Sequence, residues 1–313
     1  MDRSAFFLLF FFAFLFSHHL EGEENFYLGI AWVGSSEMSE EITKGTMELL
    51  SELVPDLIVE LQSSLSDEKS LDKTMNKFIQ EKDAVILMGQ AGLQYASDHQ
   101  LDLPLFLSAI NNPVQADLIR NIERPGGNVT GVSYFIDYGE ILSFIKNFLP
   151  ELDSVLLLYE KNNPASDADL YYLTEACRKE SVNLYSKACS PGLNMDDVFK
   201  LYYEKVDAVI FGNQNFFFEN LEDNSSLLLS IPSFSLDSLL VRRGVLASLA
   251  PDYLKLGRLL AGSIIGVLYN GKKTGDIPFG FDKDPRIHLN MSTAESLGII
   301  VPLHILRVAE VYR

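Results

Sequence analysis

The 313-residue sequence has few cysteines, histidines and basic residues: two cysteines, five histidines, and 25 lysines and arginines against 43 aspartates and glutamates. The formal net charge is therefore -18. A surface with this excess of negative charge repels phosphate backbones and anionic lipid headgroups. We expect a soluble globular protein with no nucleic-acid partner.

Long apolar runs are also scarce. The run from Ala5 to Phe16 contains twelve residues, follows Arg3 and ends at the polar Ser17. It is too short for a membrane-spanning helix, which needs roughly 20 residues, but it matches the core of a secretory signal peptide. We predict that residues 1–20 are a signal peptide that is removed on export to the periplasm or another extracytoplasmic compartment. No lipobox cysteine follows, so no lipid anchor is expected.

Motifs for catalysis, phosphate binding and metal binding are missing. Gly266 to Lys272 fits a phosphate loop, but Lys273 stands where Ser or Thr should bind magnesium, and the pattern follows a helix instead of a strand. His99, His288 and His304 are isolated in the sequence. We therefore predict no catalytic residues, no metal and no cofactor.

The two cysteines, Cys177 and Cys189, follow a predicted helix and the next predicted strand. Export would permit a disulfide between them, because extracytoplasmic compartments are oxidising. The spacing is equally compatible with two thiols, so the sequence leaves both states open.

Short apolar runs alternate with segments of helical spacing along the chain. We predict strands at 27–33, 57–61, 84–88, 105–110 and 129–133, and a second set at 155–159, 182–186, 208–211 and 233–236. Apolar runs separated by helices are typical of parallel sheets covered on both faces. The turn from Arg124 to Gly127 (RPGG) leads into the strand at 129–133, which we interpret as the first connection to the second set. The fold class predicted is therefore α/β, with two similar lobes.

Three separated motifs resemble one protein family. SAINNPVQADLI at 108–119, RPGGNVTGVS at 124–133 and LNMSTAESLGIIVP at 289–302 are similar to segments of bacterial ABC transporter substrate-binding proteins, in the family that includes tryptophan and tyrosine binders. The resemblance covers almost the whole chain after the leader. It implies a two-lobed type I periplasmic-binding-protein fold, each lobe a mostly parallel sheet flanked by helices.

The longest predicted helix, at 252–270, begins after Pro251 and ends at Gly271. The resemblance implies that this helix returns to the first lobe. The predicted domains are therefore lobe 1, residues 25–131 plus about 250–276, and lobe 2, residues 132–249 plus about 277–313.

The predicted site lies beyond the carboxyl ends of the parallel strands, where loops and helix N-termini converge in open α/β sheets. Taken singly, each polar residue there is also explained as a helix cap or turn residue. Their recurrence in both lobes predicts a pocket for a small polar molecule. The candidate ligand-binding residues are Ser35, Ser36, Gln90, Ala91, Asn111, Asn112, Tyr134, Asn163, Asn213, Asn215 and Asp237.

The resemblance also bears on the charge of the ligand. Similar family members carry a Thr-Asp pair before the proline that is Pro113 here, whereas this chain has Asn111 and Asn112. An acidic residue that would hold a ligand ammonium from lobe 1 is therefore absent. Asp237 matches the family's acidic position ahead of a glycine and is the candidate amine contact. An amino acid and a neutral molecule such as a nucleoside are the alternatives.

We predict an exported, monomeric, non-enzymatic substrate-binding protein of an ABC importer. It would capture a small polar molecule, an amino acid or similar, between its lobes by hinge closure and deliver it to a membrane permease. An exported sensory module would have the same sequence features. A less favoured alternative is an exported enzyme on the same fold, for which the sequence offers no nucleophile and base.

Overall fold

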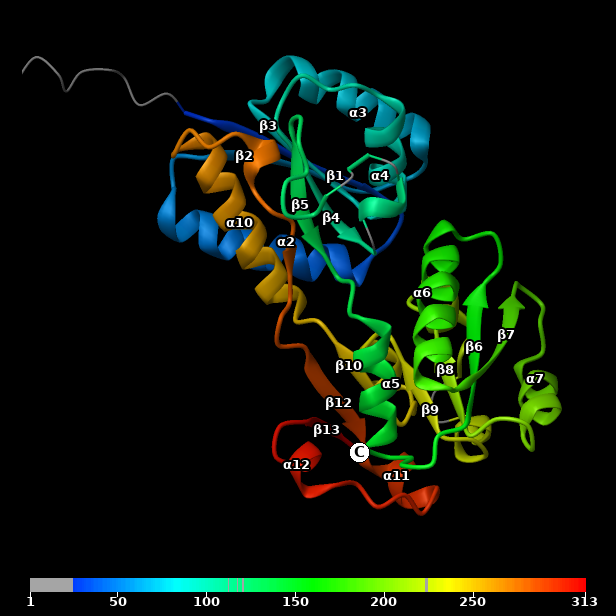
Figure 1. The fold of residues 1–313 in the computed structure, drawn as a ribbon. Coiled ribbons are helices and arrows are strands. Elements are labelled where there is room, and N and C mark those ends of the chain that lie inside the picture. The colour runs from blue at the N-terminus through cyan, green and yellow to red at the C-terminus, as the bar shows by residue number, and fades with distance from the viewer. Residues whose placement is uncertain (1–24, 112, 117, 120, 223–224) are drawn as a thin grey trace, which may run out of the picture.

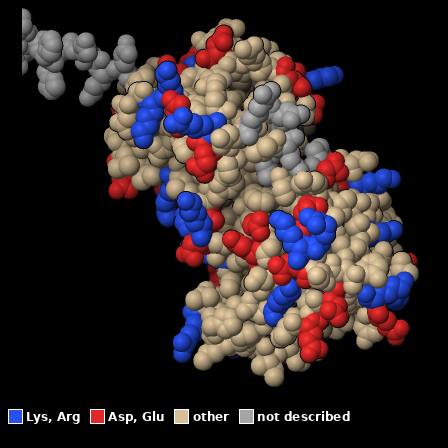
Figure 2. All heavy atoms as spheres, viewed as in Figure 1, with Lys and Arg blue, Asp and Glu red and all other residues tan. Residues whose placement is uncertain are grey.

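The computed structural model describes residues 25–313 except 112, 117, 120, 223 and 224, so the predicted signal peptide lies outside the described residues. The described chain forms two lobes, one above the other in Figure 1. Within it, no helix is long and apolar enough to cross a membrane. Acidic and basic side chains are interspersed over the visible face of both lobes (Figure 2).

Lobe 1 is built on a parallel sheet that has six strands within the described residues, in the order β11-β5-β4-β3-β1-β2. These are β1 (Tyr27–Val33), β2 (Ile58–Leu65), β3 (Ala84–Met88), β4 (Leu105–Ile110), β5 (Val129–Ser133) and β11 (Gly280–Phe281). One face packs against α2 (Glu37–Leu53) and α10 (Tyr253–Leu268), and the other against α3 (Glu68–Glu81) and α4 (Gly89–Asp98).

Lobe 2 is built on a sheet that has seven strands in the described part of the chain, in the order β13-β12-β10-β9-β8-β6-β7, with only the β10–β12 pair antiparallel. They are β6 (Ser154–Glu160), β7 (Asn183–Cys189), β8 (Ala208–Phe211), β9 (Ser233–Ser235), β10 (Ala247–Ala250), β12 (Arg286–Asn290) and β13 (Glu310–Tyr312). One core contains side chains of α5 (Tyr138–Lys146), α6 (Pro164–Glu180), α11 (Met291–Ser296) and α12 (Leu303–Leu306). The other contains side chains of α7 (Met195–Tyr202), α8 (Asn215–Asn220) and α9 (Leu239–Arg242).

Five predicted strands, at 27–33, 84–88, 105–110, 129–133 and 208–211, are confirmed with their predicted bounds. Two segments differ from prediction. The sequence pattern also predicts a helix from Pro113 to Ile122. Among the described residues of this segment, Pro113–Ala116 form the 3-10 turn η1 instead. The expected loop at Gln90 and Ala91 is the first turn of α4, because Gly89 adopts a φ of 72° and turns the strand directly into a helix.

The chain passes between the lobes three times within the described residues: after β5, between β10 and α10, and between β11 and β12. The last crossing was predicted at about 277, but β11 pairs with Val132 and Ser133 of β5, so residues 280–281 extend the sheet of lobe 1. Likewise, β10 is a strand of the second sheet, where the sequence suggested a return path at 244–249.

The second and third crossings are fastened together by Asp282, whose side chain is fully buried. Its carboxylate accepts hydrogen bonds from the backbone N–H of Asp252 at 2.9 Å and of Asp284 at 3.0 Å, and it also binds the ammonium of Lys255. A buried carboxylate with three donors holds its neighbours in a fixed geometry. These two crossings are therefore braced against each other.

The cysteines lie on opposite faces of the lobe 2 sheet. Cys177 packs with α5 in one core and Cys189 packs with α7 in the other. Both are buried free thiols, and burial raises the pKa of each to about 11. The disulfide that the sequence left open is not formed.

Helices α2 and α10 approach closely through glycines. A β-carbon at Gly257 would overlap the carbonyl oxygen of Ile42, and one at Gly45 would overlap the carbonyl oxygen of Leu254. Because the obstructing atoms belong to the backbone, no side-chain rotation relieves the overlap. This contact docks α10, which follows the second crossing, onto lobe 1.

We therefore expect Gly257→Ala to destabilise the protein by about 2 kcal/mol or more, because the two helices must move apart. Gly262→Ala is the matched control: this glycine lies exposed on the same helix with open space around it. Alanine there should stabilise the helix by up to about 1 kcal/mol. Urea unfolding measures both. Equal effects of the two variants would contradict the proposed glycine contact.

Candidate ligand-binding site

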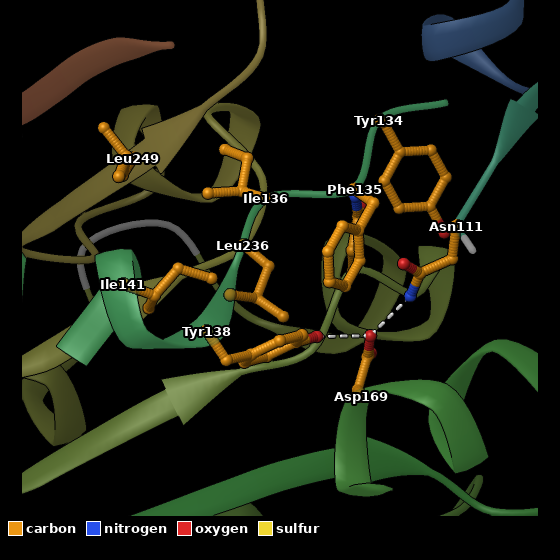
Figure 3. Close-up of a pocket in the computed structure, with 10 residues that line it drawn as sticks. Asn111, Tyr134, Phe135, Ile136, Tyr138, Ile141, Asp169, Leu236 and Leu249 are labelled. Carbon is orange, nitrogen blue, oxygen red and sulfur yellow. Dashed lines mark hydrogen bonds between the residues drawn. The ribbon is translucent and has the colours of Figure 1, made fainter. Parts of the chain in front are cut away.

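A cavity lies at the junction of the lobes, beyond the carboxyl ends of strands from both sheets (Figure 3). Its free volume is about 20 Å³, which is room for about one water molecule. A molecule the size of an amino acid therefore needs the lobes to part or the lining side chains to move. The lining residues are Asn111, Tyr134, Phe135, Ile136, Tyr138, Ile141, Asp169, Asn213, Leu236 and Leu249.

Asp169 of α6 is the charged residue in this lining, and its side chain is buried with the residue only 1% exposed. Its Oδ1 accepts hydrogen bonds from Nδ2 of Asn111 at 2.7 Å and the hydroxyl of Tyr138 at 2.6 Å. Its Oδ2 accepts one from Nε2 of Gln214 at 2.6 Å, and the backbone N–H of Asn213 adds a fourth. Four donors saturate a carboxylate. Asp169 is therefore occupied by protein groups.

Burial raises the pKa of the Asp169 carboxyl, and the hydrogen bonds from Tyr138, Gln214 and Asn111 act in the opposite direction. The donors come from α5, from the loop after β8 and from the loop after β4. Asn111 follows a strand of lobe 1, whereas Asp169 belongs to lobe 2. Their hydrogen bond therefore joins the lobes directly.

A second polar group adjoins Asp169. Burial raises the pKa of Tyr134, and the charges of Asp169 and Asp237 raise it further. The charge of Asp237 also raises the pKa of Tyr253, which lies beside Asn213. Nδ2 of Asn213 and the hydroxyl of Tyr253 are buried, and neither completes a hydrogen bond of regular geometry with the described residues. Burial raises the pKa of Tyr253 well above its ordinary value, although the neighbouring Asn213 side chain acts in the opposite direction, so the phenol stays protonated. The two groups contact each other weakly and keep hydrogen-bonding capacity for a ligand.

Asp237 is half-buried and lies two residues after the end of β9 in the sequence. Its Oδ1 accepts a hydrogen bond from the backbone N–H of Leu239 at 2.8 Å. Burial raises the pKa of Asp237 to about 6; Glu37 and Glu41 of α2 add to the rise, while the Leu239 N–H and Arg242 oppose it. This carboxylate, in contrast to that of Asp169, has capacity for a cationic partner.

A larger hollow of about 590 Å³ shares Phe135 and Ile136 with the cavity. Its other lining residues come from both lobes and the third crossing: Val114, Asn121, Ile122, Asp137, Glu140, Phe281, Asp282 and Lys283. The buried polar side chains of Asn213 and Asp169 line the smaller cavity but not this hollow. The smaller cavity is therefore the better candidate for specific recognition.

The structure brings some of the predicted site residues together. Asn111, Tyr134 and Asn213 line the cavity, and Asp237 interacts electrostatically with Tyr134 beside it. Asn215 is the first residue of α8, and Asn112 lies outside the described residues.

The other predicted residues lie outside the cavity lining: two cap helices, and three are exposed or pack within lobe 1. Ser36 caps α2 by accepting from Ser39 N at 3.1 Å, and Asn163 caps α6 by accepting from Ala165 N at 3.0 Å. Ser35 and Gln90 are exposed, and Ala91 packs against the lobe 1 core.

Sequence reasoning missed Asp169, Tyr138, Gln214 and Tyr253. One signal for Asp169 was available: it shares an inward helical spacing with Leu173, which is fully buried on the same helix. An acidic residue on a buried helix face needs a donor partner, and such a partner marks a site. Nothing local identifies the partners.

Within residues 25–313, apart from the five that are not described, no three His, Cys, Asp or Glu side chains are grouped so as to hold a metal ion. The amide of Asn213 lines the cavity, and the phenol of Tyr253 and the carboxylate of Asp237 lie near its lining residues. This set is suited to hydrogen-bonding a polar molecule.

Two mostly parallel sheets flanked by helices, joined by crossings with a cavity between them, define the type I periplasmic-binding-protein fold. The chain matches, over residues 32–312, the family described as ABC transporter substrate binding protein. It belongs to this family.

Relatives and solved structures of the same fold include amino-acid binders by their descriptions. A "Tyrosine-binding protein" of Clostridioides difficile (strain R20291) is 25% identical over 227 residues, which is 72% of this chain and 66% of that protein. This chain thus spans about two thirds of the length of that curated relative.

Two solved structures are similar at a TM-score of 0.79. The ABC domain in complex with L-Trp from Streptococcus pneumonia is 23% identical, with 92% of this chain and 99% of that chain covered. The ligand-free, open structure of a substrate binding protein with adhesive properties from Clostridium difficile is 21% identical, with the same coverage.

The raised pKa of Asp237 predicts a pH-dependent stability. Its value of about 6 in the folded protein exceeds the value of about 3.9 expected in the unfolded chain. The contribution of Asp237 to stability should therefore fall as the pH rises from about 4 through 6, because the unfolded chain loses this proton first. Asp237→Asn should be more stable than wild type by up to about 3 kcal/mol at pH 8, and nearly equal to it near pH 4.

Urea unfolding at the two pH values measures this difference. Glu52→Gln, an exposed carboxylate on α2, is the control and should change stability by less than about 0.5 kcal/mol at either pH. A loss of stability in Asp237→Asn at pH 8 would instead show that the ionised carboxylate supports the fold.

Proposed function

We propose that this chain is the exported, monomeric solute-binding component of an ABC importer, and that it binds an amino acid in the interlobe cavity. The hinge would close around the ligand, and the closed form would be recognised by a membrane permease. The family membership supports the transport role. The proposed export rests on the apolar run at 5–16 of the sequence.

The observation that carries the proposal is the set of unused polar groups beside the cavity. Asn213 and Tyr253 offer buried donors, which a carboxylate would satisfy, and Asp237 offers an acceptor, which an ammonium would satisfy. Buried donors without partners are costly, so a ligand that pairs with them gains that free energy on binding. A zwitterionic amino acid supplies both complementary groups.

The apolar part of the lining supports an amino acid with a large side chain. Phe135, Ile136, Leu236 and Leu249 line the same cavity as Asn213. Aromatic rings bury a large area against such surfaces. The tyrosine-binding description of one relative and the bound L-Trp of one similar structure point to the same ligand class. We therefore place L-tyrosine and L-tryptophan first among candidate ligands.

The size of the cavity supports hinge closure. Its volume of about 20 Å³ admits about one water molecule, so ligand must enter while the lobes are apart. Asp282 braces the second and third crossings, which fixes where the lobes pivot. Micromolar affinity requires a net of about 8 kcal/mol, within reach of several buried hydrogen bonds and one buried aromatic ring.

Isothermal titration of the leaderless protein tests the ligand class. We expect L-tyrosine or L-tryptophan to bind with micromolar affinity, whereas the corresponding amines, which lack the carboxylate, and adenosine should bind at least about tenfold more weakly, because each leaves buried donors unpaired. Binding should also weaken below about pH 6 as Asp237 becomes protonated. Tighter binding of adenosine than of either amino acid would overturn the proposal.

Two substitutions separate binding from folding. Tyr253→Phe and Asn213→Ala remove buried donors that complete no hydrogen bond of regular geometry in the described structure. The unliganded protein should keep its urea midpoint or gain stability, while affinity for the amino acid should fall about fivefold to tenfold for each. A matched loss of stability and affinity would mean that these side chains are structural.

A further inference from the structure

We propose that the hydrogen bond between Asn111 and Asp169 is a clasp that holds the lobes closed in the absence of ligand. Here "the clasp" means these two side chains. The proposal rests on the proposed function, because the clasp matters through the cavity that it closes. In this role Asp169 holds Asn111, and with it lobe 1, in position. It does not contact the ligand.

The clasp has the features of a strong hydrogen bond. Nδ2 of Asn111 lies 2.7 Å from Oδ1 of Asp169, and the two residues are 9% and 1% exposed. A carboxylate acceptor strengthens a hydrogen bond, and burial removes the competition of water. Separating the lobes would leave the carboxylate one donor short until water entered.

Each half of the clasp is held in place within its own surroundings. The backbone carbonyl of Asn111 accepts a hydrogen bond from the hydroxyl of Ser133, at the end of β5. On the other side, Tyr138 and Gln214 fix the Asp169 carboxylate. Little conformational freedom remains to be lost when the two halves meet, so more of the bond's free energy favours closure.

The clasp crosses between lobes, whereas the other side-chain bonds of Asp169 do not. Tyr138 and Gln214 lie in lobe 2 with Asp169, and Asn111 follows β4 in lobe 1 (Figure 3). Of the side-chain donors around this carboxylate in the described structure, Asn111 is thus the one that responds to opening. Its strength should set how much unliganded protein is open to a ligand.

Small-angle scattering of the unliganded, leaderless protein tests the clasp. Asn111→Ala should lower the ratio of closed to open protein about tenfold or more, since bonds to charged groups contribute this much. The radius of gyration should therefore rise above that of wild type. Tyr138→Phe is the matched control: it removes a bond to the same oxygen of Asp169 but within one lobe, and should leave the radius of gyration unchanged.

Asn111→Leu repeats the test with a side chain of the same branching and number of heavy atoms, in case alanine leaves a packing defect. Circular dichroism and urea unfolding verify that each variant is folded, because a purely structural role would lower the urea midpoint without expanding the folded protein. Expansion in both Asn111 variants but not in Tyr138→Phe supports the clasp. An equal radius of gyration in wild type and both Asn111 variants overturns it.

The scattering experiment uses no ligand, so its outcome is independent of ligand identity. Expansion of the Asn111 variants together with no binding of L-tyrosine or L-tryptophan would uphold the clasp and refute the proposed ligand class. Binding of either amino acid without expansion of the variants would do the reverse.

Discussion

The burial of one carboxylate between two lobes is the constraint on which the geometry of the cavity depends. Asp169 is removed from water, and a buried charge is tolerated only where hydrogen bonds replace its hydration. Its side-chain donors are Asn111, Tyr138 and Gln214. Each reaches it from a different segment, so satisfying this one group brings a strand end of lobe 1, the start of α5 and a strand end of lobe 2 to a single point.

The interlobe crossings and the cavity share part of the chain. Tyr134, Phe135 and Ile136 of the first crossing line the cavity. The other two crossings are joined to each other by Asp282, which does not line this cavity. In the mechanism that we propose, a ligand that contacts the first crossing touches a segment whose conformation changes when the lobes move. This overlap would couple binding to closure, as population-shift mechanisms require.

Much of the fold follows from local sequence patterns, and the site follows only in part. Asn111, Tyr134 and Asn213 line the cavity because strand ends in parallel sheets converge. The same rule also selects Ser36 and Asn163, which cap helices at strand ends. Sequence position identifies a loop at the right edge of a sheet, but it does not distinguish a side chain that turns into the cavity from one that turns back to its own helix.

By itself, the sequence determined the strand–helix alternation and the strands β1 to β9, since both depend on the spacing of apolar residues within a few positions. Only the tertiary structure assigned residues 280–281 to lobe 1, separated Cys177 from Cys189 and gave Asp169 its role. The side-chain partners of Asp169 lie 31, 45 and 58 residues away along the chain. Contacts of that separation arise from how the sheets are ordered and how the lobes face each other, and no local pattern encodes them.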